Sequence, residues 1–479
     1  MNIILGLDAG THGVRALAYA PEQRRFLAAA GHDYPRHSAA GIQEMSPTVL
    51  LETFRGTLAD ILQQLPQNVH VEALGITHQR GTVIPVDAGG VPLAAALCDS
   101  DSRAATAEEL RSLGVDPADY YRRTGCPFVS FNGMAKILWA RFHAPELYQK
   151  AAAWLSPQDY LVSCLVGSVT VTEGSASRNG CLSAGKHRLD RELFPGEAFL
   201  DHDCVPVGTS CGQITDGWAR EFPPLAGAAV IAVPGDQPAA VIGSGAVDGG
   251  LAMNLGTTFV ASLCHSVPVF DPAGMTTVEV LPENGFAMEF GTGAGGQFTD
   301  WLARMLLDGA PADKRFWAAL DARAGDAPAG ADGLRAVPLL WQVTSPGVIG
   351  GIRNLGIHHT RAHLVRAAYE GLACEARMSI EKVQTCVGRA PDTLRVFGGM
   401  SANPVFLSIL ASITGKTVVV PAEKQASACG AALTVALACG HFATLAQASA
   451  VADTGCRRYY PNEEEVYHDG FYEAYCAQR

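Results

Sequence analysis

The sequence lacks an excess of positive charge, a long apolar run and any C-x-x-C pair. The net charge is −12, so no basic stripe is available to neutralise the phosphates of a nucleic acid. No stretch approaches the roughly 18 consecutive apolar residues that a membrane span needs. No basic region precedes the first apolar run, and Asp8 interrupts that run too early for a secretory signal. We therefore expect neither a nucleic-acid partner nor a membrane partner.

The cysteines give no sign of a disulfide framework. There are 13 of them, scattered along the chain, and an odd number without metal-ligand spacing fits a reducing compartment better than secretion. A free thiol in an apolar stretch behaves as a small hydrophobic side chain. These features predict a soluble protein of the cytoplasm.

Apolar residues, in contrast, are plentiful: they make up 48% of 479 residues. A chain of this length usually needs more than one hydrophobic core, so we expect two domains. Predicted strands alternate with predicted helices, which is typical of an α/β fold. We expect strands at 2–7 and 14–20, within 71–87 and early in 228–247, and helices around 103–115 and 133–150, from Pro157 to about Val166, late in 228–247 and over 426–440.

One segment recurs about half the chain later. "LGLDAGTHGVRAL" (5–17) aligns without a gap on "LAMNLGTTFVASL" (251–263), which places Gly10 on Gly256 and Thr11 on Thr257. This repeat predicts two domains of related design, 1–246 and 247–479, each opening with a hairpin whose Gly–Thr turn faces a shared cleft. A coincidental match of two ordinary hairpins is the alternative.

A glycine turn in a hairpin presents several backbone N–H groups at one point, which suits a phosphate chain. Asp8, on the first turn only, adds a hard oxygen ligand for Mg²⁺. Either turn alone reads as an ordinary tight turn, whereas the pair favours a polyphosphate site.

In "LRVFGGMSANP" (394–404), Gly398 and Gly399 stand between a strand and a helix, where a ligand can approach the backbone closely. Asn403 could then bond a base edge; plain helix–strand packing is the alternative.

Two further stretches carry candidate polar groups. Asp236 in "PGDQPAA" stands where a strand ends and a helix begins, so the helix dipole favours an ionised carboxylate able to accept a hydroxyl proton. A plain N-cap is the alternative. "HQRGT" (78–82) and "DSDSR" (99–103) bring hydroxyl-binding side chains to turns, although solvated loop charges explain them equally well.

Taken in order, these stretches resemble the FGGY carbohydrate kinases of the actin-like ATPase superfamily. "DAGTHGVRA" is similar to the family's first phosphate motif, with His12 where a small polar residue is common, and "NGMAKILWARFHAPE" (132–146) and "GGIRNLGIHHTRAHLVRAAYEGLA" (350–373) are similar to its two diagnostic segments. "GDQPAA", "NLGTT" and "FGGMSAN" follow at family spacing. The resemblance covers nearly the whole chain and implies two actin-like, ribonuclease H-like α/β domains with a central cleft.

The resemblance implies transfer of the ATP γ-phosphoryl group to a hydroxyl of a small sugar or polyol. Asp236 would be the catalytic base and Asp8 would organise Mg²⁺. The residues implied to hold ATP are Gly10, Thr11, His12, Arg15, Gly256, Thr257, Thr258, Gly398, Gly399 and Asn403. Those implied to bind the substrate are His78, Gln79, Arg80, Asp99, Asp101 and Gln237.

The motifs do not agree on one substrate. Gln79 and Arg80 resemble glycerol kinases, but Gly81 replaces the acidic residue that should follow. Asp99 stands where many members carry a tryptophan, which favours a polyhydroxylated substrate and hence a ketopentose such as xylulose. A kinase of another polyol or signalling carbohydrate (glycerol, erythritol, a deoxy sugar) and a non-catalytic sugar or nucleotide sensor stay open as alternatives. The resemblance also makes a homodimer plausible.

Overall fold

The computed structural model describes residues 1–35, 43–195, 197–306, 314–340, 347–389, 391–463, 466–467 and 470–479. They form two compact units. Unit 1 comprises Met1–Asp248, Cys264–Met288 and Gln425–Val451, and unit 2 comprises Gly249–Leu263, Glu289–Lys424 and Ala452–Arg479. The sequence predicted one division after residue 246. The return of two later segments to unit 1 is a difference from that prediction.

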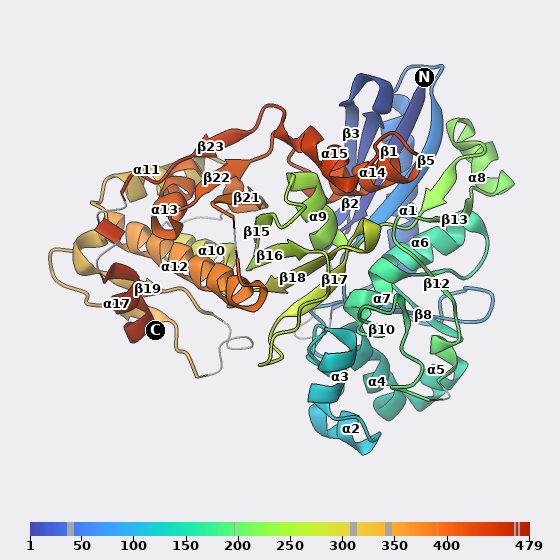
Figure 1. Ribbon diagram of the computed structural model, residues 1–479, viewed down its shortest axis with the longest axis horizontal. Helices are drawn as coiled ribbons and strands as arrows, with labels where there is room; N and C mark the ends of the chain where they lie inside the picture. Colours follow the sequence, from blue (N-terminus) through green and yellow to red (C-terminus); the bar gives the residue numbers. More distant parts are fainter. Residues whose placement is uncertain are drawn as a thin grey trace. The chain divides into compact units, whose positions relative to one another are not determined.

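Unit 1 is built on a six-stranded sheet in the order β13-β14-β5-β1-β2-β3 (Figure 1). In chain order its strands are β1 (Asn2–Ala9), β2 (Gly13–Ala20), β3 (Arg25–Asp33), β5 (His70–His78), β13 (Ser210–Gln213) and β14 (Ala229–Ile231). β1 pairs antiparallel with β2 and parallel with β5, and β5 pairs parallel with β14. The hairpin predicted from residues 2–7 and 14–20 is therefore present.

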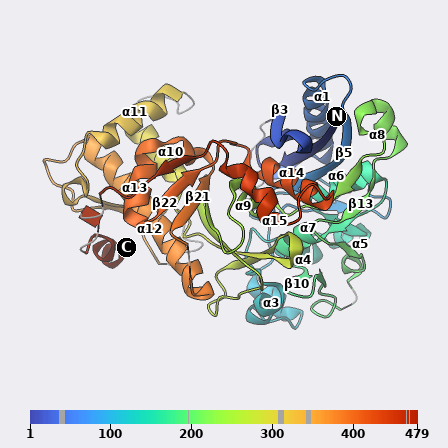
Figure 2. The ribbon, with the colours of Figure 1, turned by 45° about the horizontal axis from the view of Figure 1, so that its top comes forward.

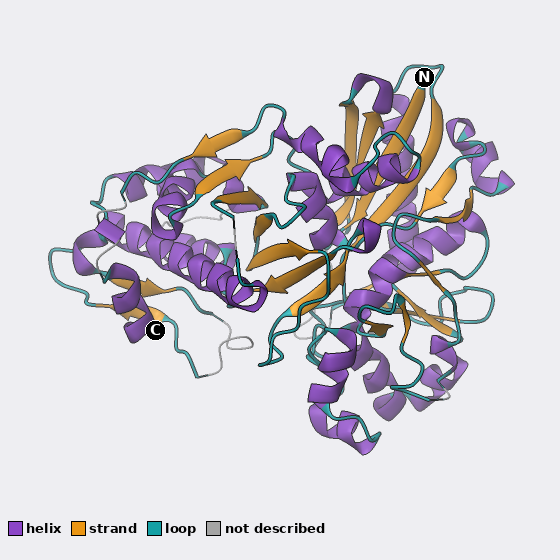
Figure 3. Cartoon of the chain, viewed as in Figure 1, coloured by secondary structure: helices purple, strands orange, loops and turns teal. Residues whose placement is uncertain are grey.

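Helices cover both faces of this sheet (Figure 3). The helices of unit 1 are α1 (Pro47–Gln63), α2 (Ala107–Ser112), α3 (Pro117–Thr124), α4 (Gly133–His143), α5 (Pro145–Lys150), α6 (Pro157–Val166), α7 (Glu173–Asn179), α8 (Asp216–Glu221), α9 (Asp236–Ser244), α14 (Ala426–Ala438) and α15 (Leu445–Ser449). Short strands accompany them: β4 (Glu44–Met45), β6 (Ile84–Val86), β7 (Ala96–Leu97), β8 (Ala153–Leu155), β9 (Val171–Thr172), β10 (Leu182–Ser183), β11 (Arg188–Leu189), β12 (Cys204–Val205) and β17 (Thr277–Val280).

The two faces of β1 are buried against different partners. Alternate residues of a strand point to opposite faces, and Ile3, Leu5 and Leu7 belong to a core cluster that includes Phe54 of α1. Gly6 points to the other face, where an added Cβ would lie 2.1 Å from the carbonyl oxygen of Ala428 on α14. A strand buried on both faces reads as a nearly continuous apolar run.

Helix α14 also packs closely on α9. An added Cβ at Gly430 would lie 1.7 Å from the carbonyl oxygen of Ala239, and one at Gly243 would lie 2.0 Å from that of Ala426. Figures 1 and 2 both show α14 beside α9 and the first strands of the chain. The small residues of 426–440 thus allow close packing of two helices and a strand.

Unit 2 contains most of a second sheet, whose strand order is β17-β18-β16-β15-β21-β22-β23. Its elements are β15 (Leu251–Leu255), β16 (Phe259–His265), β18 (Phe286–Phe290), α10 (Gly296–Leu306), α11 (Lys314–Gly325), β19 (Arg335–Val337), β20 (Gly351–Arg353), α12 (Arg361–Val387), β21 (Thr393–Phe397), α13 (Pro404–Thr414), β22 (Thr417–Val420), β23 (Arg457–Tyr459) and α17 (Phe471–Gln478). Strands β16 and β18 cross the boundary between the units along the chain.

The two sheets share one pairing pattern. The strands β2-β1-β5-β14-β13 pair antiparallel, parallel, parallel and antiparallel in turn. The strands β16-β15-β21-β22-β23 pair in the same sequence of directions. The hairpins β1–β2 and β15–β16 hold equivalent places in it, so the internal repeat of the sequence corresponds to a repeat of structure.

Among the described residues, none of the helices combines the length and the apolar character needed to cross a lipid bilayer.

Candidate active site

The first glycine turn joins β1 to β2 at the end of the central strands of unit 1. The backbone N–H of Gly10 donates to the carbonyl oxygen of Gly13 at 3.0 Å, and Thr11 and His12 are exposed. At Gly13 an added Cβ would lie 2.1 Å from the carbonyl oxygen of His32 on β3, so only glycine fits there. The turn is closed at its base and presents Thr11 and His12 to solvent.

Asp8 is the last polar residue before this turn. Its Oδ1 is buried and accepts no hydrogen bond from the described residues. The pKa of Asp8 is raised to about 7, mainly by burial and then by the nearby Asp236 carboxylate, while the Arg15 guanidinium opposes both. An unpartnered carboxylate oxygen beside a second carboxylate is a setting that a bound cation would relieve.

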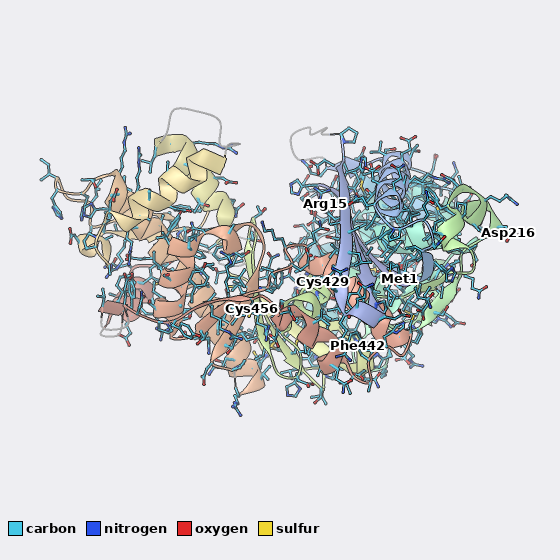
Figure 4. The ribbon with its side chains drawn as sticks, turned by 90° about the horizontal axis from the view of Figure 1, so that it is seen from above. Met1, Arg15, Asp216, Cys429, Phe442 and Cys456 are labelled. Carbon is cyan, nitrogen blue, oxygen red and sulfur yellow. The ribbon has the colours of Figure 1, made fainter. Side chains whose placement is uncertain are left out.

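Arg15 lies opposite Asp8 in the β1–β2 register and is labelled on its strand in Figure 4. Its Nη1 donates to the carbonyl oxygens of Val14 and His32, each at 3.0 Å, and its Nη2 donates to Asp33. The guanidinium thus binds β3, and its predicted contact with ATP stays a prediction. Its charge acts on Asp8 across the strand pair.

Asp236 is the first residue of α9, with Gly235 as the N-cap. Its Oδ1 accepts from Arg80 Nε at 2.9 Å and from its own neighbour, the N–H of Gln237, at 2.8 Å. No described residue donates to Oδ2. Burial raises the pKa of Asp236 and the Arg80 guanidinium opposes that shift. The carboxylate is therefore fixed through one oxygen and open at the other, as a general base requires.

Arg80 is held by a second carboxylate that the sequence did not predict. Its Nη1 donates to Glu279 Oε1 on β17 at 2.5 Å. An added Cβ at Gly235 would lie 2.5 Å from Cγ and Cδ of Arg80. The missing side chain at Gly235 thus leaves room for the arginine stem to pass the start of α9.

The remaining predicted substrate residues of unit 1 separate into two groups. Gln79 donates through Nε2 to Asp99 Oδ1, and its backbone N–H donates to the carbonyl oxygen of Ala9 at 2.9 Å. This links the 78–82 turn to the glycine turn. Gln237 is buried beside Asp236. Asp99 is near enough to Asp236 for its charge to raise the pKa of Asp236.

His78 and Asp101 are both buried, and their predicted contacts with substrate stay predictions. His78 is 0% exposed and burial lowers its pKa to about 3, so it is a neutral core histidine. Asp101, also buried, accepts from Arg103 Nε at 2.9 Å, from Arg103 Nη2 at 2.7 Å and from the N–H of Gln43 at 2.8 Å. These contacts favour structural roles over the predicted contacts with substrate.

Lys136, which the sequence singled out only as part of a diagnostic segment, fixes the loop that carries Asp99. Its Nζ donates to the carbonyl oxygens of Asp99 at 3.0 Å and Ser130 at 2.5 Å. Burial lowers the pKa of Lys136 to about 8. The ammonium group of Lys136 is therefore hydrogen-bonded to backbone oxygens, and it fixes the loop that carries Asp99.

The second glycine turn lies in unit 2, between β15 and β16. Thr257 and Thr258 are exposed at its tip. Gly398 packs beside it with φ 93° and ψ 176°, and an added Cβ there would lie 2.6 Å from Asn254 Oδ1. Unit 2 thus brings the predicted phosphate turn and the predicted nucleotide glycines together.

Asn403 caps helix α13 of unit 2, and its predicted contact with a base stays a prediction. Its Oδ1 accepts from the N–H of Phe406 at 2.9 Å as the N-cap of α13, and its Nδ2 donates to Asp321 Oδ1 at 2.5 Å. Both ends of the amide are engaged, which favours helix capping over the predicted contact with a base. The predicted meeting of the two glycine turns across one cleft stays a prediction, since they belong to different units.

Comparison with known proteins gives two matches that together span most of the chain. The N-terminal domain of the FGGY family of carbohydrate kinases matches residues 3–243, and the C-terminal domain of the same family matches residues 251–439. The chain belongs to the FGGY family of carbohydrate kinases. The resemblance inferred from the motifs and the predicted α/β fold are thereby confirmed.

Relatives of this FGGY kinase carry different substrate names. It is 27% identical to a glycerol kinase of Nocardia farcinica, over 97% of this chain and 96% of the relative. It is 25% identical to an autoinducer-2 kinase of Salmonella choleraesuis, over 97% and 91% of the two chains. The structure of a xylulose kinase from Rhodospirillum rubrum superposes with a TM-score of 0.86 at 25% identity, covering 99% of this chain and 98% of that one.

Sequence reasoning missed Glu279, the buried acid that binds Arg80. A signal was present, because Glu279 interrupts the apolar run "TTVEVLP" (276–282) of a strand, and a buried acid needs a partner. The sequence did not say which cation would supply it. The structure also explains why glycine stands at position 81. Its φ is 77°, and an added Cβ would lie 2.3 Å from the carbonyl oxygen of Phe131. No acidic residue therefore fits after Arg80.

Proposed function

We propose that this FGGY kinase transfers the γ-phosphoryl group of ATP to a hydroxyl of a small neutral sugar, with a ketopentose such as xylulose as the first candidate. The observation that carries the proposal is the Asp236 carboxylate. Arg80 fixes Oδ1, while Oδ2 receives no hydrogen bond from the described residues. That oxygen is available to accept the proton of a substrate hydroxyl as the hydroxyl attacks phosphorus.

The charges around Asp236 support a neutral, hydroxyl-rich substrate. Arg80, the nearest cation, already serves the carboxylates of Asp236 and Glu279. Asp99 adds an acceptor held by Gln79. Hydroxyls of a sugar can donate to these carboxylates, whereas the negative charge of a sugar acid would be repelled by them.

Each glycine turn offers residues that suit the phosphates of ATP, and the first also offers a ligand for Mg²⁺. Asp8 offers a buried, unpartnered oxygen, and Mg²⁺ prefers one or two carboxylates with phosphate oxygens and water as its other ligands. When bound, Mg²⁺ neutralises charge on the phosphates. The exposed Thr11, Thr257 and Thr258 provide hydroxyls for phosphate oxygens.

A sugar panel tests the proposal. ADP release is measured with xylulose, ribulose, glycerol, erythritol and a deoxy sugar, and with gluconate as the anionic comparison. We expect sugar-dependent ADP release with a pentulose and none above background with gluconate. ATP turnover indifferent to every sugar would favour the sensor alternative and contradict the proposal.

A second candidate is a kinase of another polyol or of a signalling carbohydrate. The glycerol kinase and autoinducer-2 kinase relatives favour it. The same assay separates the two, because the ranking of kcat/KM across the panel names the preferred acceptor. A cytoplasmic location and a homodimer complete the proposal, to be measured by cell fractionation and by light scattering.

A further inference from the structure

Helix α7 is buried along its length except at Arg178. The other residues of the helix are buried, whereas Arg178 is partly exposed. Gly174, near the start of the helix, packs on the segment that leads to Asp236, because an added Cβ would lie 2.4 Å from the carbonyl oxygen of Val233. Helix α7 therefore adjoins the proposed base, and Arg178 is its one side chain that a ligand can readily reach.

Two contacts fix the guanidinium of Arg178. Its Nη1 donates to Oγ1 of Thr277 on β17 at 3.0 Å. Its Cζ lies 5.1 Å from the centre of the Phe131 ring, and a guanidinium over an aromatic face is attracted to that ring. The group is thus held in place by the fold before any ligand arrives, which lowers the entropy lost on binding.

Strand β17 brings Arg178 near Arg80. Thr277 and Glu279 are two residues apart on this strand, so their side chains lie on the same face of it. Thr277 accepts a hydrogen bond from Arg178, and Glu279 accepts one from Arg80. One face of the strand therefore holds both guanidinium groups.

Phe131 and Cys126 lead to the same conclusion. The carbonyl oxygen of Phe131 occupies the place that a Cβ at Gly81, the neighbour of Arg80, would need. Burial raises the pKa of the Cys126 thiol to about 11, and the Arg178 and Arg80 guanidinium groups both act to lower it. Both arginines therefore lie near this one thiol, and both belong to the surroundings of the proposed base.

Arg178 differs from Arg80 in what it binds. Arg80 pairs with the carboxylates of Asp236 and Glu279, whereas Thr277 is the only described acceptor for the side chain of Arg178. Its Nε and Nη2 are therefore available, and these are the two parallel donors with which a guanidinium binds a pair of oxygens. A second cation placed near Arg80 without an acid of its own suits a ligand that supplies acceptor oxygens.

We propose that Arg178 binds the substrate and determines specificity: Nε and Nη2 donate to two neighbouring oxygens of the sugar, neither of which is the attacking hydroxyl. This inference rests on the proposed function, because it takes Asp236 as the base of a sugar kinase. A sugar hydroxyl has one donor and two acceptor lone pairs, so the same hydroxyl can accept from Arg178 and donate to a carboxylate such as Asp99. The site would thus favour an acceptor with adjacent oxygens, as a ketopentose has.

Two variants of Arg178 give the first test. Arg178→Met keeps an apolar stem beside Phe131 but has no donor, and Arg178→Lys keeps the charge without the parallel pair of donors. We expect kcat/KM for the preferred sugar to fall about 10–100-fold in Arg178→Met, the scale of a hydrogen bond to a charged group, with KM for ATP nearly unchanged. Arg178→Lys should recover little of this loss. Unchanged kcat/KM in Arg178→Met, or full recovery in Arg178→Lys, would overturn the proposal.

Deoxy analogues of the preferred sugar, each lacking one hydroxyl, separate a substrate contact from a structural role. For at least one analogue, the loss of kcat/KM relative to the parent sugar should be smaller in Arg178→Met than in the unaltered protein, because the two changes remove the same hydrogen bond. If Arg178→Met lowers kcat/KM by the same factor for the parent sugar and for every analogue, Arg178 contacts none of the deleted hydroxyls and the proposal is contradicted.

Arg55→Met is the matched control. Arg55 lies on α1 and also stacks on an aromatic ring, with its Cζ 4.1 Å from the centre of the Trp218 ring. Its replacement should leave kcat/KM for every sugar unchanged, even where it lowers Tm. If Arg55→Met and Arg178→Met reduce kcat/KM equally at equal loss of Tm, Arg178 acts through stability alone and the proposal fails.

Sugar binding without turnover separates this inference from the proposed function. Calorimetry with the sugars of the panel, in the absence of ATP, should show a sugar that binds the unaltered protein at least about tenfold more tightly than Arg178→Met. If this holds while no sugar is phosphorylated, the proposed function fails and the role of Arg178 stands. No binding of any sugar, equal affinity in the two proteins, or an Arg178-dependent affinity for gluconate alone would overturn the proposal.

Discussion

At the scale of single residues, two aspartates of unit 1 have opposite settings. Asp236 is fixed by Arg80 and the backbone through one oxygen. Asp8 has a buried oxygen with no partner among the described residues. The first setting suits a base that must point in one direction, and the second suits a ligand that gains its partner only when a cation arrives.

Replacing Asp236 tests the base. Asp236→Asn keeps the shape and an acceptor for Arg80 but cannot take up a proton. We expect kcat to fall about 10²–10⁴-fold, the usual contribution of a general base, with ATP affinity by calorimetry nearly unchanged. Ordinary turnover in this variant would remove Asp236 from the mechanism.

The pH dependence of stability tests whether the buried, ionised Asp8 carboxylate lowers the free energy of unfolding. Its pKa is raised to about 7 in the folded protein, so the folded state holds a proton that the unfolded state releases near pH 4. Asp8 therefore does not lower the free energy of unfolding below about pH 4. It lowers this free energy progressively as pH rises and has its full effect above about pH 7.

Asp8→Asn removes this electrostatic cost. In the absence of ATP and metal, we expect a gain of about 1 °C in Tm at pH 8 for each 1 kcal/mol of relieved cost in a protein of this size, and little gain at pH 4. Productive use of Mg²⁺–ATP should decline in the same variant. A Tm difference independent of pH would show that Asp8 is not the titrating group.

At the scale of elements, glycines set the distance between helices and strands. Gly430 brings α14 against α9, the helix that begins with Asp236. Gly430→Ala forces a methyl group onto the carbonyl of Ala239, and overpacking of this kind costs about 1–3 kcal/mol. We expect lower Tm and, because α9 must shift, lower kcat.

Gly217→Ala is the control for this change. Gly217 lies on α8 of the same unit, and an added Cβ there meets no atom within 4 Å. Its Tm and kcat should match those of the unaltered protein. A tolerated Gly430→Ala would mean that α9 and α14 are free to separate.

The loop after β21 offers a neighbouring pair of glycines in unit 2. Gly398 has a backbone conformation that only glycine adopts readily and lies against Asn254, whereas an added Cβ at Gly399 meets nothing within 4 Å. Gly398→Ala should cost about 1–3 kcal/mol and weaken ATP binding. Gly399→Ala should leave the stability of unit 2 unchanged, as thermal unfolding can show.

At the scale of the whole molecule, local patterns of sequence predicted a large part of the fold. The hairpins, α6 from Pro157 to Val166 and the start of α9 at Asp236 agree with the structure, because apolar periodicity, proline and glycine act within a few residues. Asn403 as a cap was also within reach, since Asn before Pro at a helix start is a local signal.

What escaped prediction depends on contacts between distant segments. The burial of His78 and the pairing of Glu279 with Arg80, 199 residues apart, arise only once β5, β17 and α9 are assembled. The return of Gln425–Val451 to unit 1 belongs to the same class. No pattern within a short stretch of sequence predicts which strand will be covered by a helix hundreds of residues later in the chain.

The return of Gln425–Val451 to unit 1 leads to a prediction for the chain as a whole. A fragment of residues 1–248 lacks α14, so Gly6 and its neighbours on β1 lose the helix that buries them. We expect the fragment to show no cooperative thermal unfolding, because exposed apolar sheet favours aggregation. A sharp unfolding transition in the fragment would contradict the dependence of unit 1 on α14.

Protein synthesis proceeds from the N-terminus, and domains usually fold in the order in which they emerge. In this kinase, α14 covers the first sheet but is synthesised after Gly249–Leu263 and Glu289–Lys424 of unit 2. A nascent chain on the ribosome therefore carries an incomplete unit 1 until α14 has emerged. A product of translation interrupted before α14 would lack the helix against which α9, the helix that begins with Asp236, is packed.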